Sequence, residues 1–225
     1  FRYETLIPGM AVSFNIDLLA AFFILTISLI AFVSSIYALA YVRHFYKKYN
    51  LGTLGFFYNI FIAAMLLVVT AANAIWFLIV WELMSVASYY LVIFERREEE
   101  NIKAGTLYFI MTHVGTAFIL LAFLLLYKVT GSFEFSAIQN NAAAIPSRIL
   151  HLVFASALIG FGTKAGIIPF HIWLPSAHPA APSHVSALMS GVMIKTGIYM
   201  LIRLFVDLLP QTPVSYGFII IGLGA

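Results

Sequence analysis

The feature that most constrains this chain is a series of apolar stretches, each free of charge for about 20 residues and therefore long enough to cross a bilayer as a helix. An apolar run that is too long for one crossing is divided at Asn73, and Asn15 and Asp17 precede the first stretch as possible helix caps. We expect membrane-spanning helices at residues 18–42, 54–71, 74–94, 104–127, 150–168 and 183–205, with a further helix opening at Tyr216.

Composition points to the same class of fold. The 225 residues are 63% hydrophobic and only 9% charged, with a mean hydropathy of +1.01. A soluble domain carries roughly 25% charged residues, and a chain of this size has a large surface to hydrate. Lipid is therefore the expected solvent, and the predicted fold is an all-α, polytopic transmembrane helix bundle. The net charge of +3 comes mainly from loops and suggests no nucleic-acid partner; without cysteine, disulfides, iron–sulfur ligation and thiol chemistry are excluded in this stretch.

Basic residues give a weak orientation signal. The loops at 43–53 and 95–103 carry more Lys and Arg than the opposite ends of the spans, which places both loops in the cytoplasm. The mixed-charge run 95–103 is interpreted as a solvated loop followed by a helix start, because acidic residues favour a helix N-terminus.

Three charged residues lie inside apolar stretches: Glu82, Lys164 and Lys195. A charge in hydrocarbon costs at least ~2.5–3.5 kcal/mol, so each is a functional-site hypothesis. Glu82 has no Lys or Arg one helical turn away and needs a partner on another helix, or a proton. A carboxyl and an amine that approach and separate in such a place can exchange protons, so we assign these residues to a proton relay. The alternatives are a static buried ion pair and, for Lys164, an amine that reaches the interface.

Four histidines are candidates for the same path: His113, His171, His178 and His184. Histidine titrates near neutral pH, and we expect these side chains to line a polar cavity, with His184 between Lys164 and Lys195. A helix-start hydrogen bond for His184 and a packing role for His113 are the alternatives. A zinc site is disfavoured because no Cys or carboxylate lies nearby, and prolines disfavour a haem pair. We therefore predict no metal ligand and no redox centre.

Prolines follow Lys164 closely. Pro169 and Pro175 are predicted to break that helix and free backbone carbonyls, which lipid tolerates only inside protein or beside a wet cavity. Near the end of the last full span, Arg203 is predicted to reach the interface and to form a weak surface pair with Asp207.

Three segments carry a family resemblance: WELMSVASYYLV around Glu82, TKAGIIPFHIWLPSAHPAAPSHVSALMSG around Lys164, and VMIKTGIYMLIR around Lys195. They resemble the antiporter-like, proton-translocating membrane subunits shared by complex I (NADH–quinone oxidoreductase), membrane-bound hydrogenases of the hydrogenase-4 and formate-hydrogenlyase type, and multisubunit cation/proton antiporters. The resemblance covers residues 15–203. YFIMTHVGTAF and SHVSALMSG are most similar to the large membrane subunit of hydrogenase-4-type complexes.

The resemblance implies an organisation. Such subunits contain two inverted five-helix repeats. Residues 1–53 would be family helix 3 and a cytoplasmic loop, 54–208 the first repeat (helices 4–8) with a broken helix 7, and 209–225 the truncated start of the second repeat. The chain would thus be a segment of a longer protein, without the whole path across the membrane. The family's helix-five glutamate, helix-seven lysine and helix-eight lysine correspond to Glu82, Lys164 and Lys195.

The resemblance also implies a function. We expect a proton-translocating subunit of a redox-driven complex, of hydrogenase-4 or NADH–quinone oxidoreductase type, in a bacterial or archaeal cytoplasmic membrane. The chain would be part of an oxidoreductase without cofactors or a redox site of its own, because no motif for flavin, quinone, iron–sulfur or nickel is present. Its partners would be other membrane and peripheral subunits, lipid, and protons or Na⁺. The alternatives are a cation/proton antiporter subunit, a structural membrane scaffold, and an enzyme with a metal site at 171–184.

Overall fold

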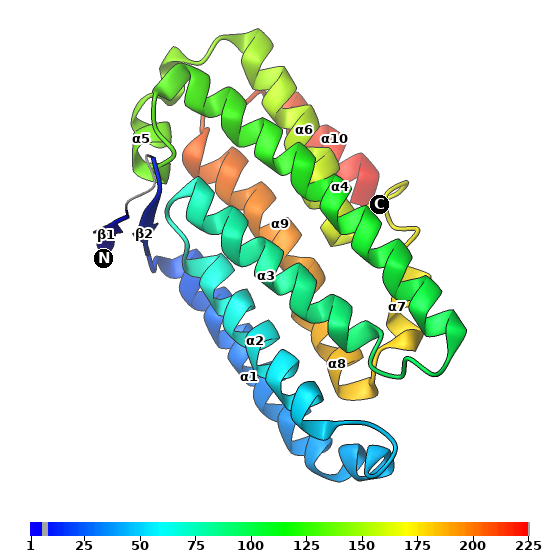
Figure 1. The fold of residues 1–225 in the computed structure, drawn as a ribbon. Helices are drawn as coiled ribbons and strands as arrows, with labels where there is room; N and C mark the ends of the chain where they lie inside the picture. The colour runs from blue at the N-terminus through cyan, green and yellow to red at the C-terminus, as the bar shows by residue number, and fades with distance from the viewer. Residues whose placement is uncertain (6–8, 225) are drawn as a thin grey trace.

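The computed structural model describes residues 1–5 and 9–224, and its helices run side by side as an elongated bundle (Figure 1). Within these residues, six helical segments are long and apolar enough to cross a membrane. They comprise α1 (Leu18–Tyr41) with the 3₁₀ turn η1 (Val42–Phe45), α2 (Leu51–Thr70), α3 (Ala74–Val92), α4 (Glu99–Thr130), α6 (Ser147–Ala165) and a composite helix from Ser183 to Leu208. The predicted polytopic helical bundle is confirmed, with each span close to its expected place.

Smaller elements lie between the spans and at the chain ends. They are the strands β1 (Arg2–Glu4) and β2 (Ala11–Ser13), the helix α5 (Phe135–Asn140), the 3₁₀ turn η2 (Ala142–Ala144), and the helices α7 (Leu174–Ala180) and α10 (Val214–Gly224). The two short strands pair antiparallel, with Arg2 opposite Ser13, beside the all-helical bundle. This pairing satisfies backbone groups of residues 2–4 and 11–13, which lie outside the helices.

Polar side chains and glycines set the ends of the spans. The side chains of Asp17, Asn50 and Asn73 accept backbone N–H groups in the first turns of α1, α2 and α3. Gly131 and Gly166 adopt left-handed conformations at the ends of α4 and α6. Asn73 therefore turns the chain between two spans, as predicted, and its side chain also donates to Glu134 Oε1 at 2.8 Å.

Glycines let the central helices approach one another closely. A Cβ on Gly160 of α6 would lie 2.5 Å from Ile119 Cγ1 and 2.8 Å from the Gly115 carbonyl oxygen of α4. A Cβ on Gly197 would lie 2.6 Å from the Phe161 carbonyl oxygen. Small residues at such contacts bring membrane helices together by packing alone. The end of α6 is thereby held between α4 and the last span, with α3 on its other flank.

The helix break after α6 begins earlier than the prolines suggest. The helix ends at Ala165, where Gly166 has a φ of +75°. Pro169 lies in the following turns, and Pro175 lies in the first turn of α7, where a proline is well tolerated. Glycine, with no Cβ, takes the left-handed conformation at little cost, so it ends the helix before a proline is reached. Trp173 Nε1 donates to the Thr163 carbonyl at 2.8 Å and satisfies one of the freed groups.

The last full span is one helix with two π segments, one within it and one at its C-terminal end. It consists of α8 (Ser183–Leu188), the π segment η3 (Met189–Met193), α9 (Ile194–Ile202) and the π segment η4 (Arg203–Leu208). The extent of the helix agrees with the prediction, whereas the π segments have no sequence signal that we recognised. A π turn holds one extra residue, and π turns are frequent at functional sites.

Arg203 ties this span to the start of α1. Its side chain is only 9% exposed, because residues of the chain cover it, and the predicted pair with Asp207 is formed. It donates to Asp17 Oδ1 at 2.8 Å, to Asp207 Oδ2 at 2.8 Å and to Tyr199 Oη at 2.9 Å. Asp17 is far away in sequence, so its contribution could not be read from neighbours of Arg203. The hydrogen bonds from Arg203 hold the pKa of Asp17 at about 2, below its ordinary value of 3.8.

Candidate functional site

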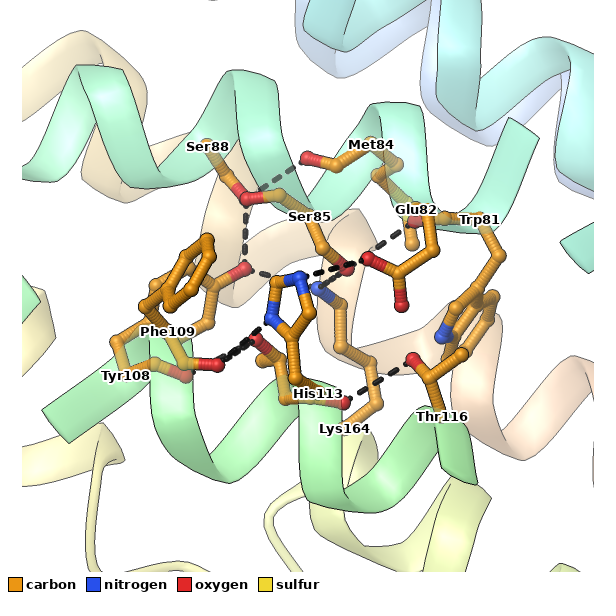
Figure 2. A network of polar contacts seen from close by, with 11 residues as sticks. Trp81, Glu82, Met84, Ser85, Ser88, Tyr108, Phe109, His113, Thr116 and Lys164 are labelled. Atoms are coloured by element: carbon orange, nitrogen blue, oxygen red, sulfur yellow. Dashed lines mark hydrogen bonds and ion pairs between the residues drawn. The ribbon is translucent and has the colours of Figure 1, made fainter. Parts of the chain in front are cut away.

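Lys164 lies at the centre of the bundle, in the last turn of α6. The residue is 2% exposed, and its Nζ donates to Ser85 Oγ of α3 at 3.0 Å and to Tyr108 Oη of α4 at 2.8 Å (Figure 2). The amine also lies over two aromatic rings, 5.1 Å from the centroid of Tyr108 and 5.8 Å from that of Trp81. Lys164 therefore does not reach the interface. Three helices enclose its amine in a pocket of neutral oxygens and π faces.

Tyr108 extends this polar cluster. Its hydroxyl lies 2.6 Å from Ser88 Oγ, which in turn donates to the Met84 carbonyl at 2.8 Å (Figure 2). Sequence analysis missed Ser85, Ser88 and Tyr108. Ser85 follows Glu82 by one helical turn and so shares its face, which is a usable signal. Tyr108 gives no such signal, because it meets Lys164 only through the packing of α4 on α6.

Glu82 of α3 pairs with His113 of α4. Glu82 Oε2 lies 3.1 Å from His113 Nε2, and His113 Nδ1 lies 2.8 Å from the Phe109 carbonyl oxygen (Figure 2). A carbonyl oxygen only accepts, so Nδ1 carries a hydrogen. The Nε2–Oε2 contact then holds one further proton, which sits either on the imidazole or on the carboxyl group. In both cases the pair is neutral overall and has one proton to exchange.

Glu82 and Lys164 are neighbours without being bonded to each other. Lys164 donates to Ser85, one turn along α3 from Glu82, while the Glu82 carboxylate is turned to His113. The second carboxylate oxygen, Oε1, is buried and has no hydrogen-bond partner among the described residues. The predicted pairing of Glu82 with Lys164 is thus not formed in this structure, although the two side chains belong to one network (Figure 2). The unoccupied Oε1 is the acceptor that a displaced lysine amine could use.

Lys195 lies on α9, and its side chain is exposed on the outside of the described bundle. Its Nζ donates to the carbonyl of Ser190 in the π segment η3. The structure therefore does not bring Lys195 into contact with Lys164 or Glu82, although α9 packs directly on α6.

The other predicted histidines make no hydrogen bond to either lysine among the described residues. His184 is 2% exposed, its ring centroid is 5.7 Å from that of Tyr41 and 5.2 Å from that of Tyr58, and its Nδ1 has no hydrogen-bond partner among the described residues. It therefore packs toward α1 and α2 and not between Lys164 and Lys195. His178 Nδ1 lies 2.7 Å from Ser186 Oγ, and the buried Nδ1 of His171 has no described partner. The described residues contain no group of three or more His, Cys, Asp and Glu side chains that could hold a metal ion.

Six candidate spans, a broken helix and ionisable groups at helix contacts define a multi-pass integral membrane protein of the antiporter-like class. The comparison with protein families agrees: residues 71–224 match the family described as NADH:quinone oxidoreductase/Mrp antiporter, transmembrane. The chain belongs to this family, and the resemblance inferred from its sequence is confirmed.

Curated relatives extend beyond this chain. Hydrogenase-4 component B of Escherichia coli is 44% identical over 213 residues, which are 94% of this chain and 31% of the relative. A putative antiporter subunit of Staphylococcus saprophyticus is 35% identical over 194 residues, 85% of this chain and 24% of that protein. The chain thus spans about a third or less of the length of these relatives.

Solved structures share the fold. A chain of the membrane-bound sulfane sulfur reductase, an archaeal respiratory membrane complex, superposes with a TM-score of 0.85 at 26% identity, covering 100% of this chain and 37% of that one. A chain of the Mrp complex from Dietzia sp. superposes with a TM-score of 0.83 at 24% identity, covering 95% of this chain and 23% of that one. The second likeness concerns the fold alone.

Proposed function

We propose that this chain is part of a proton-translocating subunit in a redox-driven membrane complex, and that Glu82, His113, Lys164 and Lys195 are its proton carriers. The observation that carries the proposal is the Glu82–His113 pair, which holds one exchangeable proton one helical turn from the serine that binds Lys164. Ionisable groups buried between membrane helices are costly and typically mark ion or proton pathways.

The proposed steps follow from the contacts. His113, the more exposed member of the pair, exchanges a proton with Glu82. The charged Lys164 amine gives a proton on toward Lys195 of the neighbouring helix α9 and, now neutral, leaves the Ser85 and Tyr108 oxygens. Glu82 then turns its free oxygen to this neutral amine and reprotonates it. Protons move only in the chain's own side chains and water, so no cofactor is involved.

The division of the chain belongs to the same proposal. Residues 54–208 would be the first five-helix repeat, with the α6–α7 break as its broken helix, preceded by 1–53 and followed at 209–225 by the start of a second repeat. The similarity to hydrogenase-4 component B over 94% of the chain supports a partner complex of hydrogenase-4 type. Other membrane and peripheral subunits would then carry the electron chemistry.

The proposal is tested in the full-length protein within its native complex, reconstituted in vesicles. Proton transport and redox turnover are measured for Lys164→Ala and Glu82→Gln, with Lys103→Ala as the matched control, because Lys103 forms only an exposed ion pair with Glu99. We expect the first two variants to lose transport and the control to keep it. Wild-type transport in both site variants would reject the relay and favour a structural scaffold.

A second candidate is a cation/proton antiporter subunit, which the similarity to the putative antiporter subunit of Staphylococcus saprophyticus favours. It differs in the coupling ion. In the same vesicles, transport that requires Na⁺ and continues without redox turnover would select the antiporter, whereas transport that stops when turnover stops would select the redox-driven subunit.

A further inference from the structure

The π segment η3 supplies the acceptor for Lys195. At its end, the backbone N–H of Ile194 bonds to the Met189 carbonyl, five residues earlier, instead of to the Ser190 carbonyl, four residues earlier. The Ser190 carbonyl accepts from Lys195 Nζ. In a regular α-helix that carbonyl would be occupied by the N–H of Ile194. The amine of Lys195 is therefore held by a group that the π turn has released.

The same π turn is connected to Lys164. The Tyr108 hydroxyl accepts a hydrogen bond from Lys164 Nζ at 2.8 Å. The same hydroxyl donates to Met193 Sδ at 3.6 Å. Met193 is the last residue of η3 and is fully buried. A continuous set of contacts thus runs from the Lys164 amine through Tyr108 and Met193 to the turn that holds Lys195.

We infer that Tyr108 and the π turn are positioning elements that couple the placement of Lys195 to that of Lys164; this rests on the proposed function. When the Lys164 amine leaves Tyr108, the tyrosine hydroxyl loses a donor and its contact with Met193 is free to change. A shift of the π turn by one residue gives the Ser190 carbonyl a backbone donor. Lys195 Nζ is then released from Ser190 and can turn toward a new acceptor.

Deleting Gly191 tests the π turn directly. With one residue fewer, the N–H of Ile194 meets the Met189 carbonyl as a regular α-helical bond, and the backbone N–H of Lys195 meets the Ser190 carbonyl. The π turn contains one extra residue, so its removal leaves the residues before and after it on the same sides of the helix. Because the deleted residue is glycine, no side chain is lost. The variant therefore removes the acceptor of Lys195 while it retains the packing of α9.

Tyr108→Phe and Met193→Leu test the connection to Lys164. The first removes the hydroxyl that both Lys164 and Met193 contact, and the second removes the sulfur acceptor at nearly constant volume. Tyr58→Phe is the matched control, because Tyr58 is also buried and its hydroxyl lies 3.1 Å from Ser35 Oγ, outside this set of contacts. If the deletion variant does not accumulate in the membrane, Tyr108→Phe and Met193→Leu still test the coupling.

Two measurements are made on the full complex: proton transport per redox turnover, and labelling of Lys195 by an amine-reactive reagent, quantified by mass spectrometry. The deletion and Tyr108→Phe each remove one hydrogen bond of a lysine amine, and we expect each to lower transport about tenfold or more. Met193→Leu removes only a weak sulfur acceptor and should lower transport less, and all three variants should raise labelling of Lys195. In a Lys195→Met background, the deletion should cause no loss beyond that of Lys195→Met alone.

The outcomes separate the two proposals. If Lys164→Ala abolishes transport while the three variants transport protons and label at Lys195 like the wild type, the positioning inference is overturned and the relay stands. If Lys164→Ala and Glu82→Gln transport normally, the proposed function itself fails. In that case, a rise in Lys195 labelling in the deletion, Tyr108→Phe and Met193→Leu variants would still support the coupling, because labelling does not depend on transport.

Discussion

The imidazole of His113 and the carboxylate of Glu82 hold one proton between them across a 3.1 Å contact that joins α4 to α3. The Phe109 carbonyl requires a hydrogen on His113 Nδ1, so the contact between His113 Nε2 and Glu82 Oε2 holds one proton. The pair can give up this proton and take another, and it carries one negative charge in between. That property suits a group at the entrance of a relay and is not needed for packing.

The first prediction concerns His113. In His113→Gln the side-chain amide can still donate to Glu82 but cannot give up a proton, so we expect proton transport to fall by about 100-fold, the lower end of the contribution of proton transfer by a side chain. The amount of assembled protein should not change. The control is His151→Gln, whose imidazole contacts the Tyr216 hydroxyl at 2.6 Å, away from the site. Transport equal to the wild type would remove His113 from the relay.

The second prediction concerns the pocket around Lys164. Ser85→Ala removes one of the two oxygens that accept from its amine, and a hydrogen bond to a charged group contributes about 1.5–3 kcal/mol. We expect a drop of that size in the free energy of unfolding, measured by thermal unfolding in detergent. Ser35→Ala, which loses bonds to neutral partners only, should cost about 0.5–1.5 kcal/mol. Equal losses in both variants would contradict a charged amine at Ser85.

The third prediction concerns the contact between α4 and α6. Gly160→Ala places a methyl group 2.8 Å from the Gly115 carbonyl oxygen, and backbone cannot move aside as a flexible side chain can. We expect a loss of about 1–3 kcal/mol and a lower yield of folded protein. Gly55→Ala is the control, since no atom lies within 4 Å of its added methyl group, and it should be neutral or slightly stabilising. An unchanged thermal midpoint for Gly160→Ala would show that this contact is looser than described.

The fourth prediction concerns pH. The pKa of Asp17 is lowered to about 2, chiefly by hydrogen bonds from Arg203. A lowered pKa contributes stability that is fully present above the ordinary value of 3.8 and is lost as the pH falls toward 2. Because the Asp17 side chain is 37% exposed, we expect only about 1 kcal/mol from this pair.

Asp17→Asn isolates that contribution, because asparagine still caps α1 while it removes the charge. The thermal midpoint of the variant should lie below that of the wild type at pH 7, and the difference should vanish near pH 2. A difference that is the same at both pH values would mean that the charge of Asp17 has no part in holding Arg203.

Sequence reasoning found the groups whose signal is local. A charge inside an apolar run stands out wherever the helix packs, so Glu82 and Lys164 were identified before any contact was known. His113 was also a candidate, but its pairing with Glu82 was not predicted, and Tyr108 was not identified, because both contacts depend on how α3, α4 and α6 meet. Arg203 shows the same limit: one partner, Asp207, lies one turn away, and the other, Asp17, is brought in by the start of α1.

By itself, the sequence determined that this protein spans a membrane several times, where the spans begin and end, and which residues place charge inside them. These properties depend on the hydropathy and capping of neighbouring residues, which are written along the chain. Only the tertiary structure decided that Glu82 pairs with His113, that Ser85 and Tyr108 hold Lys164, and that a π turn presents Ser190 to Lys195. Those contacts depend on close approach between helices, where a missing Cβ or one extra residue in a turn selects the partner.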